Sequence, residues 1–279
     1  MITGLLLLVS GAFAGAFGAL LGLGGGVLLV PLLTLGFERP LRESVAVALV
    51  CVIVTSSAAS GAHLQRRTAN LRLGLLLALF TALGSLVGGL VSFLVPERLL
   101  AGLFALLLVY VCVTMARGFL PRGRGSATAG VGGGEPPPGA GWSAGSLVAL
   151  LSTPDYRVRR VGPASGASVG SGLLSALLGV GGGVINVPTM HVLMGVPLRV
   201  ATATSNLVVG VTAIASAIIY LVNGAIDPYV AGPTALGVFA GATVGARNAH
   251  RVDVRVLRGL FVVVLGWTAL QMARRAIGA

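Results

Sequence analysis

Lysine is absent from this sequence, because all nineteen basic residues are arginine. The chain therefore has no Walker A lysine, no Schiff-base lysine and no lysine base, and it is not itself a P-loop ATPase. Charged residues of every kind make up only 9% of the chain, against roughly one quarter in soluble domains. Hydrophobic residues make up 56%, and the mean hydropathy is +0.98. This composition predicts an all-α polytopic membrane protein.

Side chains that could act in catalysis, metal binding or proton transfer are also scarce. The two cysteines, Cys51 and Cys112, lie in apolar stretches and are expected to be packing residues. All seven acidic residues fall in predicted loops or in a central spacer, so no carboxylate is expected in mid-membrane for a proton relay. His63 and His191 lie near or within apolar spans, and for His191 a helix-end role held by a backbone carbonyl is favoured over proton transfer. No Gly-x-Ser-Gly motif, aspartate pair or His/Glu cluster is found, so we expect no enzyme, no metal and no cofactor.

A glycine-rich segment occurs twice. Residues 20–31, LLGLGGGVLLVP, return as residues 177–188, LLGVGGGVINVP, 157 positions later. At the same offset Pro40-Leu41-Arg42 falls on Pro197-Leu198-Arg199, and Gly84 and Gly88 fall on Gly241 and Gly245. The sequence therefore predicts two homologous transmembrane repeats, 1–119 and 168–279. The Gly-, Pro- and Arg-rich residues 120–167 are predicted to be a flexible cytoplasmic linker.

The apolar segments differ in length. A full crossing takes about 20 residues, and some segments have only ten to twelve. Each glycine-broken region is therefore predicted to be a helical hairpin that enters the membrane and returns, followed by about three full crossings in each half; whether the first piece of the first half spans fully stays open. The predicted segments are 2–21, 27–36, 44–64, 72–94 and 98–119, then 168–178, 184–195, 200–222, 229–246 and 257–276.

The arginines set the orientation. A net charge of +12 would suggest nucleic acid in a soluble protein, but here the arginines lie between spans, where they fix topology, so no nucleic-acid partner is expected. Placing the loop at 65–72, the spacer, Arg199 and the stretch 247–258 in the cytoplasm puts fourteen arginines inside and five outside. The repeat partner of the loop at 65–72 is then outside. The two halves are predicted to be inverted-topology repeats, a plan common in secondary transporters.

The glycine motifs interrupt membrane helices. Glycine costs about 1 kcal/mol per helical position relative to alanine, and an interrupted backbone is tolerated in a membrane only where it is buried in protein or lines a polar cavity. The helical piece after the glycines presents free N–H groups, which suit an anion. The alternative is close helix packing through small residues, which we assign to Gly84, Gly88 and their partners and to Gly11, Gly15 and Gly18. The motifs contribute these candidate substrate residues: Gly22, Gly24, Gly25, Gly26, Pro31, Gly179, Gly181, Gly182, Gly183, Asn186 and Pro188.

Few polar side chains lie within the spans. Hydroxyls in membrane helices commonly bond the carbonyl of the preceding turn, which is the favoured role of each one taken alone. A carboxamide needs partners in hydrocarbon, so Asn186 and Asn206 are the strongest side-chain candidates, together with Thr204 and Ser205. Their first-half counterparts are apolar, so the second half is expected to supply most side-chain hydrogen bonds to the substrate. These counterparts are Leu29, Leu49, Val47 and Ala48.

Together, the duplicated GxGGGxxxVP-type motif, the Pro-Leu-Arg after it and Ala203-Thr204-Ser205-Asn206 resemble the TauE/SafE family of membrane permeases, the sulfite exporter or toluene sulfonate uptake permease family. The resemblance covers essentially the whole chain apart from the spacer. It implies transport of sulfur-containing anions such as sulfite, sulfonates or sulfoacetate. The family's Thr-Ser pair is present only in the second half, so two symmetric hydroxyl sites are not expected.

The predicted protein is a multi-pass secondary transporter of the bacterial inner membrane for a small sulfur-containing oxyanion. An inside-negative potential drives anions outward with about 2.3 kcal/mol per charge per 100 mV, so export needs no coupling ion. The alternative is an anion channel with a continuous pore. The expected partners are a small anionic substrate and the lipid bilayer, and homo-oligomerisation is left open.

Overall fold

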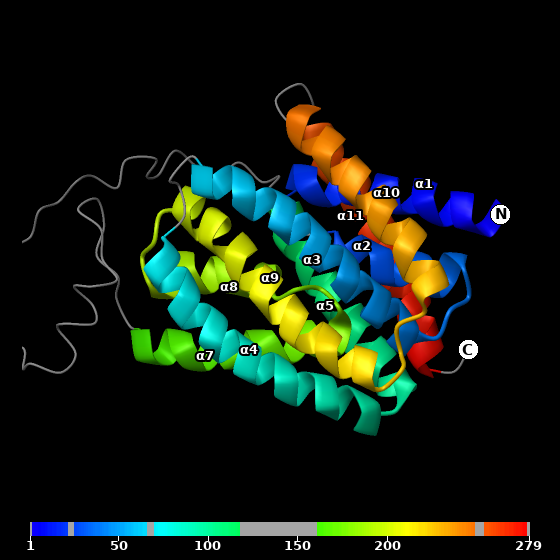
Figure 1. Ribbon diagram of the computed structural model, residues 1–279, viewed down its shortest axis with the longest axis horizontal. Coiled ribbons are helices and arrows are strands. Elements are labelled where there is room, and N and C mark those ends of the chain that lie inside the picture. The colour runs from blue at the N-terminus through cyan, green and yellow to red at the C-terminus, as the bar shows by residue number, and fades with distance from the viewer. Residues whose placement is uncertain (1, 22–24, 66–69, 118–160, 249–253, 278–279) are drawn as a thin grey trace, which may run out of the picture.

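The computed structural model describes residues 2–21, 25–65, 70–117, 161–248 and 254–277, and all regular structure in these ranges is helical (Figure 1). The prediction of an all-α protein is confirmed. The helices are α1 (Ile2–Leu21), α2 (Gly26–Pro31), η1 (Leu32–Gly36), α3 (Leu41–Gln65), α4 (Leu71–Leu94), α5 (Glu97–Arg117), α7 (Val161–Leu178), α8 (Gly183–Pro188), η2 (Thr189–Leu193), α9 (Leu198–Val222), α10 (Pro228–Asn248) and α11 (Val254–Ile277), where η1 and η2 are π-helical.

Four helices of the described residues are long and apolar enough to cross a membrane. They contain the windows Leu41–Ala58, Leu71–Leu94, Glu97–Thr114 and Val200–Val222. On α4 the exposed face is a stripe of leucines at helical spacing, from Leu75 and Leu79 to Leu90 and Leu94, whereas the buried face carries small and hydroxyl residues. An apolar outside with a small-residue inside is typical of a helix that packs in lipid.

The helix boundaries recur at a constant spacing. Helices α3 and α9 are both 25 residues long and begin at Leu41 and Leu198, which are 157 positions apart. The same offset relates the starts of α2 and α8, of η1 and η2, of α4 and α10, and of α5 and α11. In the part of the chain that the structure describes, the helices between residues 2 and 117 therefore have counterparts between residues 161 and 277.

The largest helix contacts join a helix from residues 2–117 to a helix from residues 161–277. Helix α1 packs along α10, and α4 packs along α7, while α3 and α9 contact each other (Figure 1). Glycines bring these backbones together. A Cβ added to Gly84 would overlap the carbonyl of Val169, and one added to Gly241 would overlap the carbonyl of Ala12. Gly11, Gly15, Gly88 and Gly245 make similar backbone contacts, so the packing role predicted for them is confirmed.

Helix α7 begins earlier than the sequence predicts. The apolar segment was expected to start at 168, whereas the helix starts at Val161. Its first turns contain Gly162, Pro163, Ser165 and Gly166, which contribute little hydropathy. Small residues still form helix when they pack against a neighbour, here α4, and proline is tolerated in a first turn. Residues 118–160, most of the predicted linker, lie outside the described residues.

Substituting Gly88 with leucine is expected to lower the yield of folded protein severely. A Cβ at this position would lie 2.5 Å from the carbonyl oxygen of Leu173, so α4 and α7 would have to separate. The control is Gly170→Leu on α7, because a Cβ at Gly170 has nothing within 4 Å. The measurement is the amount of monodisperse protein after detergent extraction. Equal yields from the two variants would contradict the packing role.

Candidate functional site

Both glycine breaks turn through a left-handed residue. Gly25 has φ 76° and ψ −24°, and Gly182 has φ 72° and ψ −6°. An L-residue in this conformation costs about 1–2 kcal/mol, so glycine is favoured at both positions. Each break is followed by a six-residue helix, α2 or α8, that ends in Pro31 or Pro188 and continues as a π-helix. Gly22 and Gly24 lie outside the described residues.

The two breaks touch each other inside the protein. A Cβ added to Gly26 would overlap the carbonyl oxygen of Gly179 and would lie 2.9 Å from Val52. A Cβ added to Gly181 would lie 2.7 Å from Val209 and 2.8 Å from Val52. Val52 and Val209 are 157 positions apart and are therefore repeat counterparts. Three of the predicted glycines, Gly26, Gly179 and Gly181, thus meet in one place, between the central helices α3 and α9.

Polar side chains surround the second break. The backbone N–H of Asn186 and the hydroxyl of Ser171 both bond the carbonyl oxygen of Gly182, at 3.0 and 3.1 Å. A Cβ added to Gly182 would lie 3.4 Å from Ser175 Cβ, and one added to Gly183 would lie 3.6 Å from Ser205 Oγ. Gly183 and Asn186 are three residues apart on α8 and share a face. We call Ser171, Ser175, Asn186 and Ser205 the serine–asparagine cluster.

Most polar atoms of this cluster have no hydrogen-bond partner. Ser175 Oγ, Ser205 Oγ and both side-chain atoms of Asn186 are buried and unpaired, and the three residues are only 1–2% exposed. Other buried hydroxyls behave as expected for membrane helices: Thr212 Oγ1 donates to the Val208 carbonyl and Ser216 Oγ to the Thr212 carbonyl. Leaving a buried polar group unpaired costs about 1–3 kcal/mol, so each such group needs an explanation. A polar ligand is one explanation that serves all three residues together.

The three polar residues predicted on α9 have different neighbours. Ser205 lies by the second break, because it shares a helix face with Val209, four residues on. Thr204 Oγ1 accepts a hydrogen bond from the backbone N–H of Asn70, at the start of α4. The carbonyl of Asn206 accepts a hydrogen bond from Ser56 Oγ of α3. Successive helix positions differ by about 100°, so the side chains of Thr204 and Ser205 leave α9 in different directions.

Sequence reasoning missed Ser171 and Ser175. They lie one helical turn apart on α7, and Ser175 is one turn before Gly179, where the break begins. The signal was available as a serine pair at i, i+4 immediately before a glycine break. The serine pair did not stand out, because α7 is rich in glycine and serine throughout, and such small residues are more commonly used for close packing between helices.

Pro31, predicted as a substrate residue, lines a different region. It contributes to an apolar cavity of about 470 Å³ between α1, α2, η1 and α11. The cavity contains no residue of the serine–asparagine cluster and one hydroxyl, Thr268. Its other lining residues are Phe13, Leu28, Leu32, Leu35, Gly36, Val263, Val264 and Trp267.

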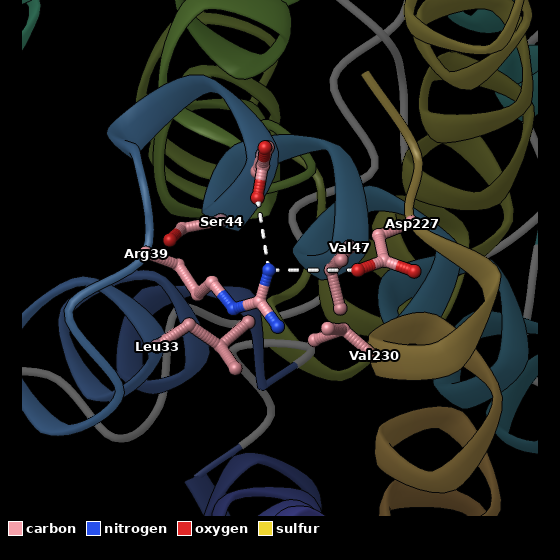
Figure 2. Close-up of a pocket in the computed structure, with 7 residues that line it drawn as sticks. Leu33, Arg39, Ser44, Val47, Asp227 and Val230 are labelled. Carbon is pink, nitrogen blue, oxygen red and sulfur yellow. Dashed lines mark hydrogen bonds and ion pairs between the residues drawn. The ribbon is translucent and has the colours of Figure 1, made fainter. Parts of the chain in front are cut away.

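An ion-pair cluster lies beside the starts of α3 and α10. Arg39, just before α3, lies 3.5 Å from Asp227, just before α10, and 3.6 Å from Glu43 (Figure 2). Figure 2 shows the guanidinium of Arg39 directed toward the carboxylate of Asp227, with Leu33, Val47 and Val230 around it. All three charged side chains are partly exposed, so each pair is worth about 0–1 kcal/mol.

His191 matches its predicted role at a helix end. Its Nδ1 lies 2.9 Å from the carbonyl oxygen of Val196, and its side chain is exposed. Among the described residues, no group of three or more His, Cys, Asp or Glu side chains is placed to hold a metal ion.

The fold and composition define a multi-pass membrane protein, and comparison with known proteins defines its family. The model of the sulfite exporter TauE/SafE family matches residues 7–272, so the chain belongs to this family. The resemblance seen in the sequence is thereby confirmed, and the protein is a membrane transporter. No solved structure matches the chain significantly.

Curated relatives of the chain are also described as probable membrane transporters. The chain is 25% identical over 273 residues to the probable membrane transporter protein YunE of Bacillus subtilis, covering 93% of each chain. It is 30% identical over 121 residues to the probable membrane transporter protein MamO of Magnetospirillum gryphiswaldense, covering 40% of this chain and 19% of that protein. The likeness to the MamO of Paramagnetospirillum magneticum is 30% over 109 residues, or 36% of this chain and 17% of that protein.

Proposed function

We propose that this protein is a secondary transporter that exports a small sulfur-containing oxyanion, such as sulfite or an organosulfonate, by alternating access. The observation that carries the proposal is the serine–asparagine cluster at the second glycine break, where buried donors lack partners. Hydroxyl and amide groups donate hydrogen bonds to the oxygens of an anion, and bonds to a charged group contribute about 1.5–3 kcal/mol each. The family supports the substrate class, because its name refers to sulfite export.

The absence of charged side chains in the cluster suits an anion that has to be released after it is transported. The cluster is neutral, so it holds an anion through dipoles and hydrogen bonds and without a fixed counter-charge. An inside-negative membrane potential favours outward movement of an anion by about 2.3 kcal/mol per charge per 100 mV. We therefore propose export without a coupling ion.

Contacts between helix ends support inverted repeats. Arg42, in the first turn of α3, donates to the carbonyl of Val95, just after α4. Arg39, just before α3, pairs with Asp227, just before α10. Helix α4 therefore ends where α10 begins. Because α4 and α10 are repeat counterparts, their opposite directions favour two halves of opposite orientation, joined by the linker predicted at 120–167.

Cysteines at the counterpart positions Glu38 and Gly195 are expected to be labelled from opposite sides of the membrane. Both residues are exposed and 157 positions apart, so each reports the accessibility of the same position in its own repeat. Glu38→Cys should react with an impermeant maleimide from outside, and Gly195→Cys only from the cytoplasm, in a background with Cys51 and Cys112 replaced by alanine. Labelling of both from one side would make the halves parallel.

Counterflow in proteoliposomes tests the proposed function. Vesicles loaded with excess unlabelled sulfite and diluted into radiolabelled sulfite should transiently accumulate label, because a carrier exchanges substrate across the membrane. A channel with a continuous pore would equilibrate the label without this overshoot. Competition by sulfate, thiosulfate and sulfoacetate would rank the substrates. Absence of protein-dependent flux for all four anions would contradict the proposal.

A further inference from the structure

We infer that the chain carries one substrate site, whose polar side chains all come from the second half, in which Ser175 contacts the substrate, Ser171 positions the break, and anions without a cationic group are preferred. The inference rests on the proposed transport function and concerns how its site is built. It adds two serines of α7 to Asn186 and Ser205, and it assigns a selectivity to the cluster.

The first step is the geometry of α7. Ser175 lies against Gly182, buried, with its hydroxyl unpaired. Ser171, one turn earlier, donates to the Gly182 carbonyl at 3.1 Å and so ties the break to α7. Ser168, one turn before Ser171, bonds the Ala164 carbonyl of its own helix at 2.8 Å and is an ordinary buried serine. The unpaired state of Ser175 is therefore specific to the break and is not shared by its helix neighbours.

The second step is a comparison with the first break. The counterparts of the four cluster residues, 157 positions earlier, are Ala14, Gly18, Leu29 and Ala48. All four are buried and none carries a polar side chain. Among the described residues, a Cβ added to Gly25 would find a single neighbour within 4 Å, the carbonyl oxygen of Ala14, at 3.6 Å. Repeat symmetry therefore holds for the backbone at Gly25 and Gly182 and in the short helices after them, and it fails for the polar side chains.

The third step is the chemistry of the cluster. Its hydroxyls and its amide can donate to oxyanion oxygens, but it contains neither a carboxylate nor an aromatic ring to receive an ammonium group. The acidic side chains among the described residues, Glu38, Glu43, Glu97 and Asp227, lie in helix-end or loop positions, away from the break. An ammonium group could pair there only with neutral oxygens, those of Asn186 and the serines, and burying it without a counter-charge is costly. The site is therefore suited to sulfite and is expected to bind a zwitterionic aminosulfonate such as taurine much more weakly.

Ser175→Ala tests this assignment in the purified full-length protein. If Ser175 donates to the substrate, the dissociation constant for sulfite should rise by about ten- to 150-fold. The unliganded Tm should stay the same or rise, because an unpaired buried hydroxyl is removed. A purely structural serine would instead lower the Tm and leave sulfite binding unchanged. Ser168→Ala is the matched control and should bind sulfite like the wild type.

Taurine tests the predicted selectivity. Together with the wild-type result, it distinguishes failure of this inference from failure of the proposed transport function. Taurine in excess should neither raise the Tm nor compete with sulfite in counterflow. If the wild-type protein shows sulfite counterflow but Ser175→Ala binds sulfite normally, or taurine competes, the inference is overturned while the transport function stands. If the wild type shows neither sulfite binding nor counterflow with any anion, the proposed function itself fails.

Discussion

Asn186→Leu is expected to weaken sulfite binding by at least about a hundredfold while making the unliganded protein more stable. The amide is 1% exposed and neither of its side-chain atoms has a partner, so the free protein bears about 1–3 kcal/mol for each unpaired group. Leucine removes this cost. It also removes up to two donated hydrogen bonds to the anion, each worth about 1.5–3 kcal/mol. Leucine is compatible with this backbone, because Leu29 occupies the counterpart position and is fully buried.

The opposite signs of the two effects make this variant informative. Ordinary destabilisation would lower the Tm and the affinity together, whereas the site role predicts a higher Tm with lost binding. The control is Leu29→Asn, which places an unpaired amide at the first break. It should lower the Tm and leave the dissociation constant for sulfite unchanged. Normal sulfite affinity in Asn186→Leu would remove this residue from the site.

Gly182→Ala is expected to reduce the transport rate by more than tenfold, whereas Gly25→Ala should retain most of it. Both substitutions place an L-residue at φ near +75° and incur about the same strain, 1–2 kcal/mol. They differ in what the new methyl group meets. At Gly182 it lies 3.0 Å from Ser171 Oγ and 3.4 Å from Ser175 Cβ, inside the cluster. At Gly25 the nearest atom of the described residues is the Ala14 carbonyl oxygen, 3.6 Å away.

Initial rates of sulfite counterflow, normalised to the folded protein in each vesicle preparation, are the appropriate measurement. Because the backbone strain is matched, the difference in transport rate between the two variants measures the effect of placing a methyl group among the polar side chains beside Gly182. Equal losses in both variants would indicate that the breaks serve the fold and that the polar side chains beside Gly182 have no role in transport.

Much of the fold follows from the sequence because repetition and hydropathy constrain it strongly. The predicted segment 2–21 coincides with α1, and 72–94 differs by one residue from α4, Leu71–Leu94. Lipid requires long apolar helices, so their composition is distinctive. Where helices pack through small residues instead, hydropathy fails, as it did over the first seven residues of α7.

The candidate site was only partly predictable. The glycine motif identified the breaks, and the lone asparagine of the second copy identified Asn186, because an amide in hydrocarbon requires a partner. Which of Thr204, Ser205 and Asn206 faces the break depends on the rotation of α9 about its axis. That rotation is set by contacts of Thr204 with α4 and of the Asn206 backbone with α3, which no spacing along the chain reveals.

Equilibrium dialysis of radiolabelled sulfite against the purified protein tests the central claim most directly, that a single oxyanion site lies at the second glycine break. The account predicts about one saturable site per chain in the wild type, the same in Leu29→Asn, and none detectable at the same concentrations in Asn186→Leu. Two sites per chain, or undiminished binding by Asn186→Leu, would contradict it.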